Sequence, residues 1–212
     1  MNHTFSGLIL GGFVEKALYG LSGIFIGFIL SSFKEWWILK FKRKKEAEFL
    51  SVHVSFLLER FIEECAEIVE DDGLYHGQYN QEGCRQAHAK EPSLNLKSLD
   101  VDWKSLPSGL MYRILDLPNE IYKANKRISS VEEHVASPPD YEEIFEERQY
   151  AYAKLGLLAI KYVDELRDLG SLRKRGRNKH NPEKTLIDKR NEIESNIQLR
   201  ESNKYQRGRL DK

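Results

Sequence analysis

The stretch EAEFLSVHVSFLLERFIEECAEIVED, residues 46–71, decides the fold class because its apolar residues recur every three or four positions. One face carries these residues: Leu50, Val54, Leu57, Leu58, Phe61, Cys65, Ile68 and Val69. The other face carries glutamates: Glu59, Glu63, Glu67 and Glu70. Such spacing places the apolar side chains along one stripe of an α-helix. We therefore predict a helix over residues 46–71 that packs its apolar stripe against other helices.

Two further helices are predicted in the middle of the chain. Residues 108–115 form a short helix, and Pro118 suits the first turn of the next helix, which runs to residue 136. The sequence Ser137-Pro138-Pro139 then stops it, because proline cannot continue a helical hydrogen-bond ladder.

A last long helix is predicted over residues 140–169. Asp140 followed by Glu143 resembles a capping box at its start, and Gly170 suits its C-terminal cap. Its apolar stripe consists of Ile144, Tyr152, Leu155, Leu158, Ala159, Tyr162, Val163 and Leu166.

Residues 72–96 have no sustained period and are rich in glycine, glutamine, asparagine and histidine, so we expect a long loop. Strand signals are nearly absent from the chain. The fold class is therefore predicted to be all-α, with residues 46–170 forming a small antiparallel bundle of about four helices.

The N-terminal region predicts a membrane anchor. Residues 17–33 carry no charge, and residues 14–33 reach the roughly 20 apolar residues that a transmembrane helix needs. Residues 1–13 would be a short external segment, and residues 34–45 a basic juxtamembrane stalk that continues into the bundle. Glycine and serine share one face of this segment, at Gly20, Gly23, Gly27 and Ser31. Small residues in such a row favour helix–helix packing, although glycine is also common in membrane helices in general.

The flanking residues predict the orientation of this anchor. Trp36 and Trp37 stand where an interfacial aromatic belt belongs. A basic cluster follows: Lys40, Lys42, Arg43, Lys44 and Lys45. Because basic residues are retained on the cytoplasmic side, we expect a single-pass protein with its N-terminus outside and its C-terminus in the cytoplasm. Glu15 and Lys16 are read as an interfacial pair, with a functional role in the membrane as the alternative.

Charge is distributed unevenly, although the whole chain is neutral with 33 basic and 33 acidic residues. Residues 1–45 have a net charge of +5, residues 46–170 of −12 and residues 171–212 of +7. The last segment is predicted to be a flexible basic tail with a solvated helix over 182–201. Membrane lipid, an acidic protein partner or the chain's own acidic segment 46–170 fits such a tail. Aromatic residues are scarce beside its basic ones, so a base-stacking nucleic-acid surface is not indicated.

Enzyme signatures are missing: the sequence has no phosphate-binding glycine loop, no G-x-S-x-G, no H-E-x-x-H and no CxxC. Two E-E-x-x-E patterns, at 63–67 and 142–146, and one E-x-x-D pattern at 165–168 remain. Together they resemble the all-helical nucleoside triphosphate pyrophosphohydrolases of the MazG type. The resemblance implies a Mg²⁺ site formed by Glu63, Glu64, Glu67, Glu165 and Asp168. The alternative is a solvated acidic face.

His76, Cys84 and His88 lie in the long loop and are of the types that bind zinc. Their spacing matches no common zinc pattern, so we expect surface residues and predict no metal, no cofactor and no catalytic residue.

The leading functional hypothesis is a membrane-anchored interaction or scaffold module. It would hold a protein partner at the inner face of the membrane and self-associate through the glycine face of its anchor. The runner-up is an effector that permeabilises or gates the membrane in a stress or antiphage response. A Mg²⁺-dependent pyrophosphohydrolase is the third hypothesis.

Overall fold

The computed structural model describes the backbone of residues 5–137, 141–173 and 181–210, and the side chains of residues 28–204 within these ranges, except residues 29 and 32. Two compact units are distinguished, Met1–Lys45 and Glu46–Lys212. The elements are α1 (Phe5–Glu70), the short 3₁₀ turns η1 (Leu96–Ser98) and η2 (Trp103–Ser105), α2 (Ser108–His134), α3 (Glu142–Leu169) and α4 (Pro182–Leu210). No strand occurs in the described ranges, which confirms the all-helical prediction.

The predicted membrane anchor is wrong. Among the residues that the structure describes, no helix combines the length and the apolar character that crossing a membrane requires. In the part of α1 with described side chains, the apolar run ends at Phe33, and Lys34 and Glu35 follow it at once. The transmembrane helix over 14–33, the external N-terminus and the single-pass location at the membrane are all corrected by this finding.

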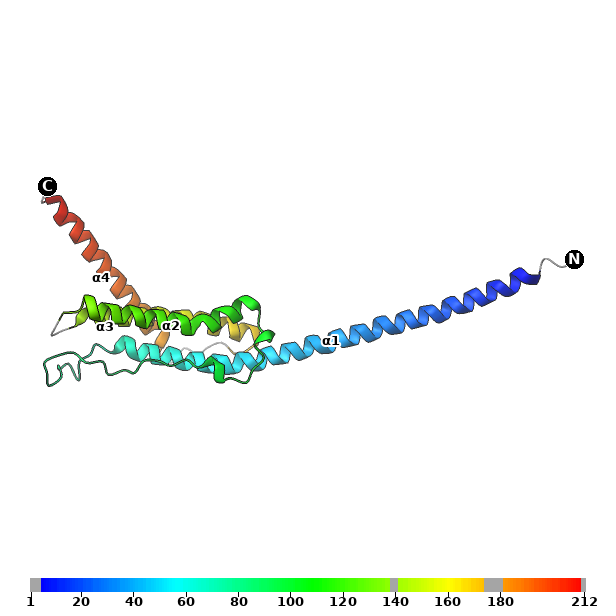
Figure 1. Ribbon diagram of the computed structural model, residues 1–212, viewed down its shortest axis with the longest axis horizontal. Coiled ribbons are helices and arrows are strands. Elements are labelled where there is room, and N and C mark those ends of the chain that lie inside the picture. Colours follow the sequence, from blue (N-terminus) through cyan, green and yellow to red (C-terminus); the bar gives the residue numbers. More distant parts are fainter. Residues whose placement is uncertain (1–4, 138–140, 174–180, 211–212) are drawn as a thin grey trace. The chain divides into compact units, whose positions relative to one another are not determined.

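In the second unit, α3 is the central helix; the C-terminal part of α1 and helix α2 run antiparallel to it, and α4 crosses it obliquely in the same general antiparallel sense (Figure 1). Hydrogen bonds between helices show this direction, because residue numbers rise along each neighbour as they fall along α3. The bonds join Glu59 to Arg167 (3.0 Å), Asp71 to Arg148 (2.9 Å), Arg113 to Glu165 (2.8 Å), Asn125 to Tyr152 (2.7 Å), Tyr150 to Glu194 (3.3 Å) and Glu146 to Arg200. The C-terminal part of α1 therefore runs in the same direction as α2.

This arrangement explains the long loop. Two consecutive helices that run in the same direction need a connection that returns along the length of the bundle. Residues 71–107, which include η1 and η2, make that return between α1 and α2 (Figure 1). The sequence predicted the loop, but it predicted a simple antiparallel bundle around it.

The core is built by all four helices. Its fully buried residues include Leu50, Val54, Leu58, Phe61 and Ile68 of α1, Ile114 and Leu117 of α2, Tyr152, Val163 and Leu166 of α3, and Leu186 of α4. Each buried Leu, Ile or Val side chain contributes roughly 1.5–3 kcal/mol to stability. Burial follows the predicted stripe of residues 46–71, where only Leu57 is partly exposed.

Close contacts between helices depend on two glycines, one within α3 and one at its C-cap. A Cβ atom on Gly156 would lie 2.7 Å from Leu186 Cδ1 and 3.2 Å from Cys65 Cβ. A Cβ atom on Gly170 would lie 2.9 Å from that of Ser51. Gly170 is the C-cap of α3, as predicted, but its φ of −78° is ordinary, so glycine is required there by packing.

Helix boundaries differ from the prediction in three places. The two helices expected on either side of Pro118 are one continuous α2, because its buried face spans the proline with Ile114, Leu117 and Ile121. At the start of α3 the cap position is Tyr141, while the predicted cap residue Asp140 lies outside the described residues. The helix expected over 182–201 is α4, which is longer (Pro182–Leu210) and is not fully solvated, because it buries Leu186 and Ile193.

Candidate functional site

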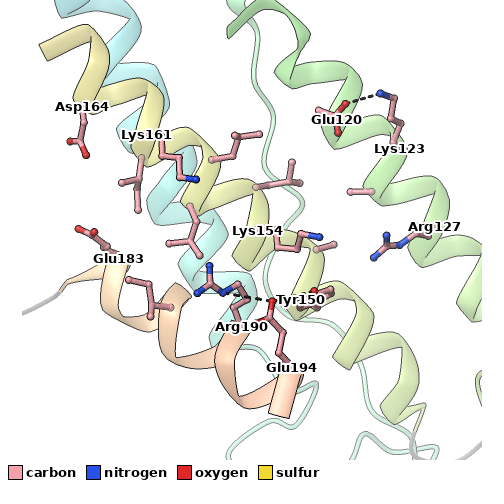
Figure 2. Close-up of a pocket in the computed structure, with 17 residues that line it drawn as sticks. Glu120, Lys123, Arg127, Tyr150, Lys154, Lys161, Asp164, Glu183, Arg190 and Glu194 are labelled. Atoms are coloured by element: carbon pink, nitrogen blue, oxygen red, sulfur yellow. Dashed lines mark hydrogen bonds and ion pairs between the residues drawn. The ribbon is translucent and has the colours of Figure 1, made fainter. Parts of the chain in front are cut away.

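A groove of about 800 Å³ lies over α3, between α2 and α4 (Figure 2). We call it the α2–α4 groove. Helix α2 contributes Glu120, Lys123, Ala124 and Arg127. Helix α3 contributes Tyr150, Ala151, Lys154, Leu155, Leu157, Leu158, Ile160, Lys161 and Asp164. Helix α4 contributes Glu183, Ile187, Arg190 and Glu194.

The floor of the groove is apolar and comes mainly from α3. Ala151, Leu155 and Leu158 recur at helical spacing, and Leu157 stands beside them. Leu157 and Leu158 are only partly buried within the chain. Ile187 extends this apolar surface on to α4 and is also partly exposed. The groove therefore leaves apolar surface of two helices in contact with solvent.

The walls of the groove are charged, and most of these charges are paired within the chain. Lys123 Nζ lies 2.6 Å from Glu120 Oε1 on the α2 wall, and this hydrogen bond raises the pKa of Lys123. Arg190 Nε lies 3.8 Å from Glu194 Oε1 on the α4 wall. The dashed lines in Figure 2 mark both pairs.

Two more polar side chains of the groove, Arg127 and Tyr150, form hydrogen bonds with residues on other helices. Arg127 Nε donates to Glu147 Oε1 of α3 at 2.6 Å. The hydroxyl of Tyr150 donates to Glu194 at 3.3 Å, and burial together with the Glu194 charge raises the pKa of Tyr150. Asp164 also has an interaction partner within the chain.

Two lysines of the groove differ from the rest. Lys154 and Lys161 are exposed on α3 and, among the residues that the structure describes, neither forms an ion pair. The Lys154 ammonium stands 5.0 Å from the centre of the Tyr150 ring, a cation–π contact that leaves its charge available. Figure 2 shows both side chains on the groove side of α3. Among the described residues that line the groove, Lys154 and Lys161 are thus the basic residues without an ion pair.

Outside the groove, a buried polar cluster around Asp71 holds the long loop against α3. Asp71 Oδ2 accepts hydrogen bonds from the backbone N–H of His88 (2.8 Å) and Ala89 (2.9 Å) and from Arg148 Nη1 (2.9 Å). Asp71 Oδ1 accepts from the N–H of Gly73 (3.0 Å). Both charged side chains are buried, with Arg148 7% and Asp71 6% exposed. Sequence reasoning missed this cluster, because Asp71 looked like an ordinary helix-ending residue.

The hydrogen bonds of this cluster fix the charge of Asp71. Burial, the largest single influence, favours the neutral acid, but the backbone N–H groups and Arg148 together hold the pKa of Asp71 below its ordinary value. Asp71 therefore remains an anion at neutral pH and fastens the loop to α3.

The structure does not bring the predicted Mg²⁺ ligands together. Glu165 forms an ion pair with Arg113, and Glu64 forms one with Arg60. Because α1 and α3 are antiparallel, with Arg167 opposite Glu59, the 165–168 stretch lies at a different level from residues 63–67. No group of three or more acidic, histidine or cysteine residues that could hold a metal occurs in the described ranges. Glu67 and Asp168 lie within the described ranges, so this finding covers them too.

The loop residues of zinc-binding type form no group of three or more in the described ranges either. The ring of Tyr75 contacts those of His76 and His88, with centroids 4.5 Å and 5.8 Å away. Cys84 makes a different contact: its backbone N–H donates to Asn80 Oδ1 at 2.8 Å.

The predicted N-terminal residues divide into two sets. The side chains of Glu15, Lys16, Gly20, Gly23 and Gly27 lie outside the described ones. The others are exposed on α1: Ser31, Trp36, Trp37, Lys40, Lys42, Arg43, Lys44 and Lys45. Within this second set, Lys40 Nζ stands 4.9 Å from the centre of the Trp36 ring.

No protein-family model, no curated protein and no solved structure matches this chain. A functional assignment therefore depends on the geometry of the bundle and of its groove.

Proposed function

We propose that this chain is a protein-interaction module and that the α2–α4 groove receives a helix of a partner protein. The observation that carries the proposal is the partly exposed apolar floor formed by Leu157, Leu158 and Ile187 between two charged walls. An apolar centre with a polar rim is the usual composition of a protein-binding surface.

A helix is the favoured occupant because of the shape of the site. The α2 wall and the oblique α4 wall lie on either side of α3, so an added helix could lie between them along the apolar surface of α3. Amphipathic helices bind such grooves with anchor residues at helical spacing. Burial of Leu157 and Leu158 by the partner would supply the affinity, and the charged walls would select its orientation.

Site-specific crosslinking tests the proposal. A photoreactive amino acid is placed at Leu158 in the full chain, expressed in the cells that make it naturally. A matched position is Tyr112, which is 69% exposed on α2 and outside the groove. We expect a discrete adduct from position 158 that is lost when Leu157→Arg is added, and none of that size from position 112. Adducts of equal yield from both positions, or none from position 158, would refute the docking role.

A further inference from the structure

The α2–α4 groove carries a specific charge pattern on its floor. Two acids on its walls, Glu120 and Glu194, are paired with basic residues of the same wall. Lys154 and Lys161 are left without ion pairs in the described part of the chain, and they stand seven residues apart on one side of α3. At 1.5 Å per residue they are separated by about 10.5 Å along the helix. Leu157 and Leu158 lie between them.

We propose that the partner segment is an acidic amphipathic helix with two carboxylate residues seven positions apart and two apolar residues between them. This inference rests on the proposed function, because it names the chemistry of the helix that the groove would bind. Two turns of any α-helix cover the same distance of about 10.5 Å, so both carboxylates can meet the two lysines at once. The apolar residues at the third and fourth positions between them would then face Leu157 and Leu158.

The carboxylates of an acidic partner would offset the cost of removing Lys154 and Lys161 from water. A partner that covers the groove removes water around Lys154 and Lys161, and an uncompensated charge is costly to desolvate. Carboxylates at the matching spacing compensate both charges, whereas a neutral or basic helix leaves them unpaired. Selection against basic helices therefore follows from the same two residues.

Peptide binding to the full chain tests this inference. The first probe is a fluorescent helical peptide with two glutamates seven apart and leucines at the third and fourth positions between them. The second probe is identical except that lysines replace the glutamates. We expect the first probe to bind the wild-type chain more tightly than the second. The double variant Lys154→Glu and Lys161→Glu should weaken the first probe by about 10- to 50-fold and strengthen the second.

A matched control separates local from overall charge. Lys97 and Lys104 are exposed and lie outside the groove, so Lys97→Glu with Lys104→Glu makes the same change in net charge. This control should bind both probes as the wild type does. An equal loss in both double variants would overturn the inference, because the effect would then come from net charge.

The remaining outcomes separate this inference from the proposed function. Equal binding of both probes, abolished by Leu157→Arg, would keep the groove as a docking site and refute the acidic pattern. Absence of binding by either probe would also refute the acidic pattern, and crosslinking at Leu158 would still decide the docking role. Displacement of the first probe by a single-stranded oligonucleotide, or self-association of the chain that Leu157→Arg removes, would assign the groove to a different occupant and overturn the inference.

Discussion

The buried pair of Asp71 and Arg148 provides the strongest stability prediction. In Asp71→Asn the side chain keeps its shape but loses its charge opposite an arginine that is only 7% exposed. One of the two side-chain positions also becomes an NH₂ group. If it replaces Oδ2 it faces three donors, and if it replaces Oδ1 it faces the N–H of Gly73. Either orientation therefore leaves at least one buried donor without an acceptor.

The expected loss follows from these contacts. Removing one partner of a buried ion pair costs about 3–5 kcal/mol. Asparagine keeps part of the hydrogen bonding, so we expect the free energy of unfolding to fall by about 3 kcal/mol. A domain of this kind is stable by only about 5–15 kcal/mol, so the change is large. Urea denaturation followed by far-ultraviolet circular dichroism at pH 7 measures it.

The neighbouring Asp72 supplies the control. Its carboxylate is exposed and accepts one hydrogen bond, from the N–H of Leu74 at 2.9 Å. Asp72→Asn should cost less than about 1 kcal/mol. The double variant Asp71→Asn with Arg148→Met should lose less than the two single variants together, because the two residues share one network. Equal losses in Asp71→Asn and Asp72→Asn, or strict additivity, would refute the role assigned to the buried pair.

Other predictions concern acid, packing, a buried hydroxyl and a phenol. The pKa of Asp71 is lower in the folded chain than in the unfolded chain. Its contribution to the free energy of unfolding is therefore complete above the unfolded pKa of about 3.9 and is lost as the pH falls through the folded pKa. Denaturation at several pH values should show the stability difference between wild type and Asp71→Asn shrinking below about pH 4. Gly156→Val should cost about 2 kcal/mol by overpacking, whereas Gly109→Val, whose Cβ meets no atom within 4 Å, should cost less in the same urea assay. Ser55→Ala should raise the urea midpoint, because the buried Ser55 hydroxyl has no hydrogen-bond partner in the described part of the chain. Burial raises the pKa of Tyr152 to about 12, so ultraviolet titration should show one phenol that ionises last, absent in Tyr152→Phe, and its contribution to stability should decline as pH rises above about 10.

Sequence periodicity was sufficient for two of the helices that form the core. The stripes of residues 46–71 and 140–169 predicted which faces are buried, because burial of an amphipathic helix depends mainly on the spacing of its apolar residues. The long loop was also predicted, from its composition. Both predictions depend on local sequence patterns, which do not depend on what the helices pack against.

The way in which the helices pack together could not be predicted from these patterns. A helix over residues 182–201 was predicted, but as a solvated one, because the many charges of α4 hide the sparse buried pair Leu186 and Ile193. Without the packing of α4 against α3 there is no second wall, so the groove could not be predicted. Glu165 was proposed as a metal ligand because sequence shows its type and spacing, while its partner Arg113 lies 52 residues away.

The N-terminal prediction failed for a related reason. It joined a run of apolar residues to the tryptophans and the basic cluster behind it, and each of these signals is typical of a membrane anchor. The described helices contain no stretch that satisfies both requirements for crossing a membrane.

Protection of the groove floor tests the docking role most directly. Leu158→Cys is introduced into a full chain in which Cys84 is serine, since Cys65 is buried. Its rate of labelling by a small thiol reagent is compared between the purified chain and an extract of the cells that make it. A cysteine at Tyr112 serves as the reference. The account predicts slower labelling at position 158 in the extract, restored to the purified rate by Leu157→Arg, with no change at position 112. Equal labelling of position 158 in both samples would contradict the account.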